Sequence, residues 1–521
     1  MRTLYTNCHV HSLEDDRVYT AMGVDGGRIC YLGDEIEPGY DVVDLKGAHI
    51  APRLFDSHMH LLYTIVLSGQ SFFLSEVKDD AVYPDKAEDA VQRIREYAEK
   101  NPKCRIIVAN GFIPTAFASP RLLTRSELDE AAPGRAVVVY TIDGHSSSLS
   151  TKMLELLGLS LEEYPDGILR GESHEFNQGR ITDLIASSLS LSAIAKGVMN
   201  FINSSYDSGL TGFAALDGNE DSKSDVLTRV LAFIAARLPL DIAFYPQYQD
   251  YKKAEPLFRM QKRKRVGGCS SWELDGAVNS KSAAFYSPYK GSDDPGHKYY
   301  SDERIEALVK KATDEDILLT AHAIGPAAID QIINAYEKCQ IEKKNGMYRI
   351  DHFEFPSESA VKKVKDMPIA ITIQPGFSYI DKRYLHSYES YLEKEQLDRL
   401  MPLKELCESG VCLLGSSDSP VQEIDPFLQM KGMIHYYDEE ESISPIDAYK
   451  TYSVNAGLAL GEDFTLSLGN EATFNVYRKS PYEELSKEDI LDVYVRGKKV
   501  KRVRRPILHL LSMVFRRPKL I

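Results

Sequence analysis

The sequence predicts an α/β protein built on a (β/α)8 TIM-like barrel, and two observations support this fold class. Short apolar runs alternate with helical stretches along residues 317–418, as expected for parallel strands that are buried on both faces. Residues able to bind a metal ion follow several of these runs. Because a (β/α)8 barrel keeps its chemistry at the carboxyl ends of its strands, both observations indicate the same architecture.

The first candidate barrel strand ends in two histidines. An apolar approach over residues 48–55 leads to His58 and His60. Side chains alternate across a strand, so both imidazoles point to the same side and can bind one ion. A chain with 13 histidines can contain such a triplet by accident, and His9 and His11 form a second one. That second triplet lies among short alternating runs without evident ligand partners, so we interpret it as a strand surface.

Three further ligand candidates follow consecutive strand-helix units. Strands are expected at 317–321, 348–351, 369–373 and 411–415, with helices at 326–340, 357–365 and 396–409. His322, His352 and Asp418 stand at the ends of these strands. A single histidine at a strand end more often only forms hydrogen bonds. Together with His58, however, these are four potential ligands at equivalent positions, and the sequence therefore predicts a metal site.

At these positions the chain resembles the amidohydrolase superfamily, and within it the metal-dependent branch called amidohydrolase family 3. The matching stretches occur in the family's order and are residues 51–60, 321–325, 349–352, 373–375 and 415–420. Two late segments resemble the family's closing helix and return strands, residues 444–456 and 467–476. The resemblance extends from about residue 3 to about residue 499. It implies a barrel and a small β-sandwich domain formed from both chain ends.

The resemblance also implies how the chain is divided. Residues 1–52 and 465–499 would form the β-sandwich, residues 53–464 the barrel, and residues 500–521 a basic C-terminal tail. Residues 61–205 exceed what one barrel helix needs and contain their own strand-like runs at 105–109 and 136–140. We interpret this stretch as an insertion that sets substrate choice, as loops at the carboxyl face of a barrel do. Within it, His145 matches a family position near the substrate, although it is also compatible with an ordinary turn histidine.

The resemblance assigns roles to the candidate residues. His58, His60, His322 and His352 would be metal ligands, and Asp418 would be both a ligand and the general base and acid that moves the proton of the attacking water. Zn²⁺ is the first choice of ion, because imidazole suits it and it has no competing redox chemistry. A divalent ion in such a site lowers the pKa of bound water from about 16 towards ~7.

One departure from the family concerns the bridge between two metal ions. Many relatives use a carboxylated lysine on the fourth barrel strand, and here that position falls on Ser271, with no lysine among residues 265–280. One ion is therefore favoured over two. Cys269 as a thiolate, or Glu273, can ligate zinc, and Glu172 in the insertion is a more remote candidate. An unpaired buried cysteine is often simply a small apolar residue, which is the alternative for Cys269.

Three functions are compatible with this site. The first is a metal-dependent hydrolase of a carbon-nitrogen bond other than a peptide bond, in an amide or cyclic amide of a small molecule. The second is a deaminase of an amino-substituted heterocycle, which the same ligand set supports. The third is a non-catalytic binding protein on the same fold. Retention of all four histidines and Asp418 argues against this last alternative.

Composition narrows the partners and the compartment. The net charge of -15 disfavours nucleic-acid binding, which requires clustered cations. Seven cysteines without a Cys-x-x-Cys pair, no signal-peptide core and no run of ~20 apolar residues lead us to expect a cytoplasmic protein. The resemblance is compatible with a homodimer. From Arg496 to Ile521 there are ten Lys or Arg and no Asp or Glu. This segment suits an anionic membrane surface, a solvated tail or a helix packed on a partner subunit.

Overall fold

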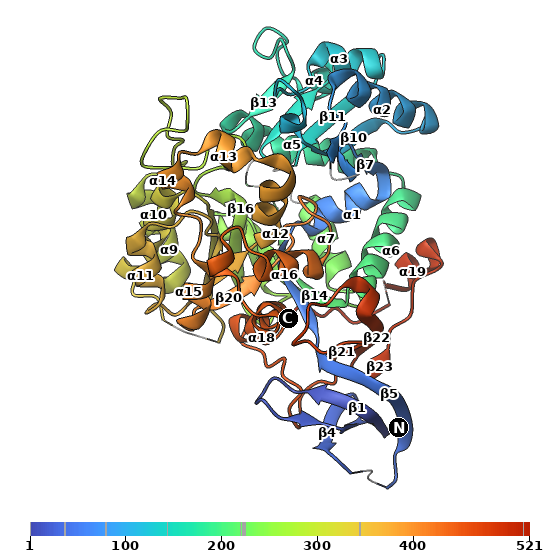
Figure 1. The fold of residues 1–521 in the computed structure, drawn as a ribbon. Coiled ribbons are helices and arrows are strands. Elements are labelled where there is room, and N and C mark those ends of the chain that lie inside the picture. The colour runs from blue at the N-terminus through green and yellow to red at the C-terminus, as the bar shows by residue number, and fades with distance from the viewer. Residues whose placement is uncertain are drawn as a thin grey trace.

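The computed structural model describes residues 2–35, 38–78, 81–142, 144–218, 220, 226–342, 345–513 and 515–521 (Figure 1). Its centre consists of parallel strands in two sheets, which confirms the α/β class. One sheet has the order β15-β14-β6, with β6 (Leu54–Met59), β14 (Leu210–Asp217) and β15 (Asp241–Pro246). The other has the order β16-β17-β18-β19-β20, with β16 (Arg265–Glu273), β17 (Leu318–Ala323), β18 (Tyr348–His352), β19 (Ile369–Ile373) and β20 (Cys412–Gly415).

Backbone hydrogen bonds join the two sheets where β6 meets the segment after β20. The Asp418 N–H donates to the His58 carbonyl (3.0 Å), and the His60 N–H donates to the Ser419 carbonyl (2.8 Å). Met59 and Ser419 form a parallel bridge between these two bonds. The carboxyl end of β6 is thereby fixed against the loop that carries Asp418.

Helices between the strands cover the sheets, and α9 (Asp302–Asp314) illustrates why the sequence forms them. The Ser301 hydroxyl accepts a hydrogen bond from the Arg304 N–H at the start of the helix, where Asp302 and Glu303 also favour its positive end. The buried side chains recur at helical spacing and are Ile305, Leu308, Val309 and Ala312. Other covering helices are α7 (Val226–Ala235), α8 (Tyr251–Phe258), α10 (Pro326–Lys338), α11 (Glu358–Val364), α16 (Pro426–Ile434), α17 (Pro445–Tyr452) and α18 (Val454–Leu460).

One predicted helix is wrong. The stretch expected as a single helix at 396–409 contains two short helices, α14 (Lys394–Leu397) and α15 (Leu403–Glu408). Pro402 immediately precedes α15. A proline disfavours the helical conformation for the residue before it, so the chain breaks at this point.

The insertion has a sheet of its own, separate from the central strands (Figure 1). Its order is β13-β12-β11-β10-β7, formed by β7 (Ser71–Phe73), β10 (Ile106–Phe112), β11 (Ala136–Thr141), β12 (Ser146–Leu149) and β13 (Ile168–Arg170). The strand-like run predicted at 136–140 lies in β11, and the run predicted at 105–109 corresponds to β10 except that Arg105 precedes the strand. The accompanying helices are α1 (Leu61–Gln70), α2 (Ala87–Lys100), α3 (Arg125–Ala131), α4 (Thr151–Leu157), α5 (Glu172–Ser188) and α6 (Leu191–Asp207).

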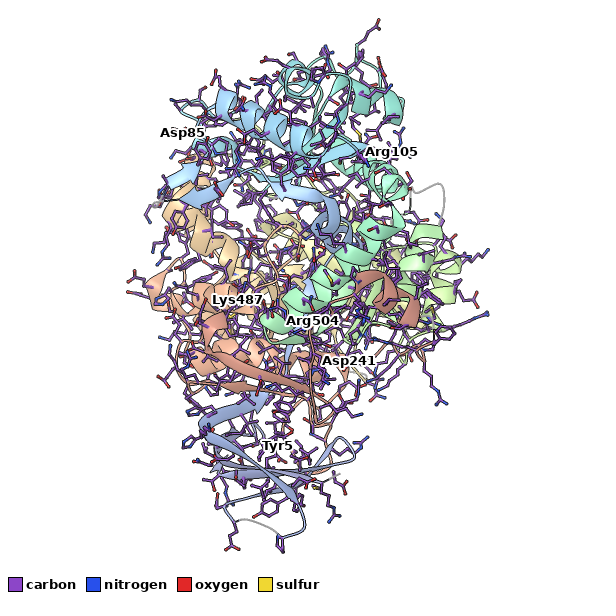
Figure 2. All side chains as sticks on the ribbon, turned by 90° about the vertical axis from the view of Figure 1, so that its right-hand side faces the viewer. Tyr5, Asp85, Arg105, Asp241, Lys487 and Arg504 are labelled. Atoms are coloured by element: carbon purple, nitrogen blue, oxygen red, sulfur yellow. The ribbon has the colours of Figure 1, made fainter. Side chains whose placement is uncertain are left out.

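Both chain ends contribute to one eight-stranded sheet at the opposite end of the molecule from the insertion. Figure 2 shows this through Tyr5 in the sheet and Asp85 and Arg105 in the insertion. The sheet contains β1 (Thr3–His11), β2 (Val18–Tyr19), β3 (Ala21–Asp25), β4 (Arg28–Gly33), β5 (Asp41–Pro52), β21 (Phe474–Tyr477), β22 (Ile490–Val495) and β23 (Lys498–Lys499). It is mixed, because β1 and β5 run parallel. The two-sheet sandwich stays a prediction.

His9 and His11 lie in β1 of this sheet, next to a third histidine that the sequence analysis did not associate with them. The His49 ring stacks between those of His9 and His11, and His11 Nε2 is 2.9 Å from His49 Nδ1. Burial and the two neighbouring imidazoles lower the pKa of His11 to about 4. We therefore expect the His11 imidazole to be neutral at pH 7.

The end of the chain returns to the central sheets. Helix α19 (Pro506–Met513) lies beside α6 (Figure 1), and the last two residues, Leu520 and Ile521, are buried. The Arg265 guanidinium donates to the Ile521 carbonyl (2.6 Å). Along the described chain, no single helix is long and apolar enough to cross a bilayer. By length and composition alone one bent pair passes that test, Phe176–Ser188 with Leu191–Asp207, which meet at 111°.

Candidate metal centre

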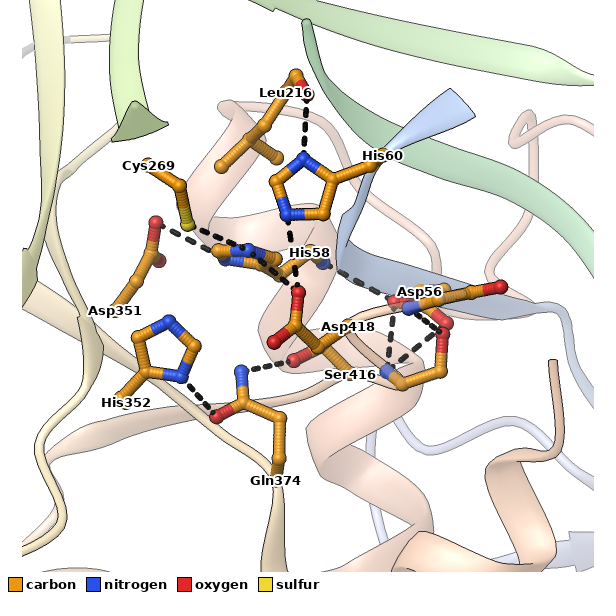
Figure 3. A network of polar contacts seen from close by, with 12 residues as sticks. Asp56, His58, His60, Leu216, Cys269, Asp351, His352, Gln374, Ser416 and Asp418 are labelled. Atoms are coloured by element: carbon orange, nitrogen blue, oxygen red, sulfur yellow. Dashed lines mark hydrogen bonds and ion pairs between the residues drawn. The ribbon is translucent and has the colours of Figure 1, made fainter. Parts of the chain in front are cut away.

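His58 and His60 enter the site from the carboxyl end of β6 (Figure 3). His58 is fully buried, with its Nδ1 3.2 Å from Asp351 Oδ2 and its Nε2 3.2 Å from Asp418 Oδ1. His60 donates from Nδ1 to the Leu216 carbonyl (3.0 Å), which directs its Nε2 at the same Asp418 oxygen, 3.2 Å away. The two imidazoles therefore converge on one carboxylate oxygen.

His322 and His352 reach the same place from β17 and β18. His352 donates from Nδ1 to Gln374 Oε1 (2.8 Å), and His322 Nε2 lies 3.3 Å from the Gly276 carbonyl. Their other ring nitrogens, His352 Nε2 and His322 Nδ1, are buried without a hydrogen-bond partner among the described residues. Buried polar atoms are rarely left unpaired, so these nitrogens fit a bound cation.

Cys269 stands between the two pairs of histidines. Its Sγ lies 3.5 Å from His58 Nε2. Potential ligand atoms lie within 4.8 Å of one another in three overlapping groups: His58, His60 and Cys269; Cys269, His322 and His352; and His58, His352 and Asp418. The structure thus brings together all the metal-ligand candidates named first from the sequence, with Cys269 shared by two of the groups.

Charge in the cluster favours ionised ligands. Burial alone would raise the pKa of the Cys269 thiol, but His58, His322 and His352 outweigh it and hold that pKa well below its usual value. Burial would likewise raise the pKa of Asp418, but the neighbouring His58 and His60 outweigh this effect and hold that pKa well below its usual range. A thiolate and a carboxylate are the forms that bind metal ions.

Neighbouring polar groups hold the histidines in place. Asp351, which contacts His58 Nδ1, is itself paired with the Arg349 guanidinium at 2.8 Å. Gln374 donates its amide to the Ser416 hydroxyl (2.8 Å) while it accepts from His352. Such partners fix the tautomer and orientation of a ligating imidazole.

The other ligand candidates named from the sequence lie differently. The Ser271 hydroxyl donates to the Gln247 carbonyl, and Ser271 belongs to none of the three groups of described residues. Glu273 accepts the Ser270 N–H (2.8 Å) and is likewise outside those groups, although it lines the adjoining cavity. The side chain of Glu172 lies outside the described part of the chain.

A cavity of about 130 Å³ opens beside the cluster, between the central strands and the insertion. His145, on the turn between β11 and β12, lines it, and its ring is edge-to-face with that of His322 at 5.6 Å between centroids. The sequence analysis missed Asp217, which also lines this cavity. Its carboxylate accepts the N–H groups of Leu61 and Leu62, and burial raises its pKa to about 7. Its place at the carboxyl end of β14 was the signal that could have identified it.

This fold and this cluster of buried histidines agree with one family of enzymes. The chain belongs to the amidohydrolase family, whose family model matches residues 41–501. It is accordingly an amidohydrolase, a hydrolase acting on carbon-nitrogen bonds other than peptide bonds.

Several relatives are similar along nearly their whole length. YtcJ of Bacillus subtilis (strain 168), described as an amidohydrolase, is 25% identical over 505 residues, which cover 90% of this chain and 92% of YtcJ. The N-substituted formamide deformylase of Arthrobacter pascens is 22% identical over 523 residues, covering 92% and 94% of the two chains. A metal-dependent hydrolase structure from Pyrococcus horikoshii has a TM-score of 0.72 at 20% identity, covering 92% of this chain and 98% of that one. The last likeness shows the fold.

Proposed function

We propose that this amidohydrolase is a metal-dependent enzyme that hydrolyses an amide or cyclic amide of a small molecule. The single observation that carries the proposal is the convergence of four imidazoles, three of them buried, with a thiol and a carboxylate beside a cavity. The description of one relative as an N-substituted formamide deformylase supports an amide of this kind. We also propose that the two parallel sheets act as one (β/α)8 barrel, with the chain-end strands as a separate small domain.

The ligands would be His58, His60, His322, His352 and Asp418, with Cys269 as an additional ligand. We favour one Zn²⁺, because imidazole and thiolate suit it. When bound, the ion would polarise the scissile carbonyl and make water more acidic. Cys269 belongs to two of the three ligand groups, so a second ion held with the help of its thiolate is the alternative that metal analysis would reveal.

The residues of the chain would move the proton and hold the substrate. Asp418 faces both His58 and His60 from the edge of the cavity. It would accept the proton of the attacking water and return it to the leaving nitrogen. His145 lines the same cavity, and we propose that it contacts the substrate.

Metal analysis of the purified protein tests this proposal. We expect about one zinc per chain in the native protein, and retained folding with hydrolysis reduced at least about a hundredfold in Asp418→Asn. Cys269→Ala is compared with Cys412→Ala, because both cysteines are 8% exposed and only Cys269 lies in the cluster. A fall from two ions to one in Cys269→Ala alone would mean that the thiolate bridges them.

Two results would contradict the proposal. Absence of metal after zinc is supplied would favour a binding protein over an enzyme of this type. The second result would be ammonia release from amino-substituted heterocycles without cleavage of formamides or cyclic amides. The activity would then be deamination and not amide hydrolysis.

A further inference from the structure

A side cavity of about 60 Å³ adjoins the main cavity at the metal cluster. Both cavities are lined by His145, His352 and Asp418. The side cavity therefore extends the site, and a substrate whose amide lies at the cluster can place another of its groups there.

Carboxyl groups are numerous along these walls. Glu354 and Asp381 line the side cavity, and the main cavity adds Asp183, Asp217 and Glu273. Among the described residues that line either cavity, none is a lysine or an arginine. An anionic substrate group in the side cavity would lie beside these carboxyl groups without a lysine or an arginine to compensate its charge.

Glu354 is placed to accept a hydrogen bond from a substrate group in the side cavity. It follows His352 by two residues, and its Oε2 accepts the Tyr388 hydroxyl (3.0 Å), a neutral donor. Along the described chain, neither Glu354 nor Asp381 forms an ion pair with a lysine or an arginine. Asp381 is already used by the N–H groups of Ser387 and Tyr388, so Glu354 has the greater remaining capacity to accept hydrogen bonds.

A second acceptor points to the same ligand chemistry. The Asn279 Oδ1, which also belongs to the lining of the side cavity, is buried without a hydrogen-bond partner among the described residues. A carboxylate and an unpaired carbonyl oxygen are both hydrogen-bond acceptors, so a ligand in this cavity must supply hydrogen-bond donors. A buried carboxylate is stabilised most by a donor that also carries positive charge.

We propose that the side cavity binds a cationic, hydrogen-donating group of the substrate, such as an ammonium or a guanidinium, with Glu354 as its specificity-determining acceptor. This inference rests on the proposed amide hydrolysis and narrows the substrate class to amides that carry a basic substituent.

Ligand binding tests the inference without requiring turnover. Calorimetry with the zinc-loaded protein compares benzylguanidinium with benzylurea, which has a similar shape and no charge. We expect the guanidinium to bind about ten- to a hundredfold more tightly, since a charge-assisted hydrogen bond contributes that much. In Glu354→Gln the preference should fall towards unity, whereas Glu358→Gln, an exposed carboxylate paired with Arg399 nearby, should keep it.

Equal binding of the two ligands, or tighter binding of the urea, by the native protein would overturn the inference even if Glu354→Gln failed to fold. If neutral amides are hydrolysed while the guanidinium shows no preference, the proposed function stands and the substrate class is wrong. If the guanidinium binds selectively but no amide is cleaved, the proposed function fails and the side cavity remains a cation site.

A different observation, on the surface of α19, carries a second proposal. Three residues of this helix are strongly exposed, Ile507 (46%), Leu508 (57%) and Leu511 (54%), and Phe515 beyond it is 90% exposed. At about 100° per residue, the three helical positions fall within one arc of about 100°. Leu510 and Met513 point the other way and pack against the core.

Basic side chains flank this apolar face on both sides. Arg504 and Arg505 precede the helix and Arg517 follows it, and the described part of the chain offers none of the three an acidic partner. Figure 2 shows the side of the molecule that carries Arg504. The absence of Asp and Glu from residues 496–521 contrasts with the net charge of -15 of the whole protein.

We infer that α19 docks this protein on an anionic membrane surface. An amphipathic helix with basic flanks binds in the plane of such an interface, with apolar burial and attraction to anionic lipids acting together.

Sedimentation with vesicles tests the docking. The native protein should sediment with mixed phosphatidylserine and phosphatidylcholine vesicles at least about tenfold more strongly than with phosphatidylcholine alone, and salt should weaken this binding. Combined Arg504→Gln, Arg505→Gln and Phe515→Ser substitutions should abolish it, while Leu468→Ser, at a residue 64% exposed, should not. Equal sedimentation with both vesicles, or no sedimentation together with a dimeric mass, would overturn the inference.

Discussion

A buried carboxylate at the start of β15 connects three distant parts of the chain, and its removal should destabilise the whole protein. Asp241 is 5% exposed. Its oxygens pair with Arg53 Nη1 at 2.7 Å, Arg496 Nη2 at 2.7 Å and Lys519 Nζ at 3.0 Å. Arg53 precedes β6, Arg496 follows β22, and Lys519 belongs to the end of the chain. The Asp241→Asn substitution keeps the size of the side chain and removes its charge.

The three ion pairs should contribute unequally to stability. The Arg53 side chain is 6% exposed, and without Asp241 its buried charge would keep only a longer ion pair with Glu471, at 3.8 Å, so we expect this loss to cost up to about 3–5 kcal/mol. Arg496 and Lys519 are 40% and 44% exposed, and solvent screening limits each of these pairs to about 1 kcal/mol or less. We therefore expect Asp241→Asn to lower the melting temperature by several degrees in scanning calorimetry.

Acid should remove the same stabilisation. Burial alone would raise the pKa of Asp241, but the positive charges of Arg53, Arg496 and Lys519 outweigh this effect and hold that pKa below its usual value. A carboxyl group with a depressed folded-state pKa stabilises fully above its unfolded pKa of about 3.9 and loses this effect as the pH falls. The difference in melting temperature between native protein and Asp241→Asn should therefore be constant near pH 7 and narrow below about pH 4.

A matched control uses an exposed pair. Asp25 is 2.9 Å from Arg2, with both side chains more than 40% exposed, so solvent screening should leave the melting temperature of Asp25→Asn close to that of the native protein. Equal melting temperatures for native protein and Asp241→Asn at pH 7 would refute the reasoning. So would a difference that persists unchanged in acid.

Three further predictions concern the site and the insertion. Gln374→Leu removes the acceptor of the His352 Nδ1–H, so zinc affinity measured by chelator competition should fall about ten- to a hundredfold, and an unchanged affinity would contradict this role. Gly197→Ala would place a Cβ 2.1 Å from the Ile65 carbonyl oxygen on α1. Calorimetry should then show a loss of about 1–3 kcal/mol as α1 and α6 are forced apart. Thr124→Ala removes the capping box of α3 and should cost about 1 kcal/mol, seen as faster hydrogen exchange in that helix alone.

The central strands could be predicted closely because burial dictates their composition. The expected strand at 369–373 matches β19, and those at 317–321 and 348–351 differ from β17 and β18 by two residues or fewer. Strands buried on both faces are continuous apolar runs, which the sequence displays directly. The polar residue that ends each run must then face the same edge of the sheet, so the sequence suffices to place His322 and His352 there.

The fourth central strand, β16, was harder to interpret, because counting residues assumes a regular strand. Between Gly268 and Glu273 the pairing of β16 with β17 shifts register, and Ser270 has a φ of +56°. Such a bulge changes which side chains face the site. It turns Ser271 towards Gln247 and leaves Cys269 at the histidines. The side cavity was also missed, because Glu354 and Tyr388 are 34 residues apart and meet only through tertiary structure.

The basic composition of the C-terminal segment alone did not predict that both of its ends are bound to the body of the protein. Its ten basic residues were compatible with a solvated tail, yet Arg496 and Lys519 pair with Asp241, and Ile521 bonds to Ile242 through its backbone N–H at 3.0 Å. The segment is thus fixed at both ends, and α19 between them is held against the body of the protein. Binding a surface with a helix that is already formed avoids the entropy cost of ordering it. A membrane surface would therefore meet a prepared apolar face rather than a flexible tail, and truncation after Met513 should weaken both stability and vesicle binding.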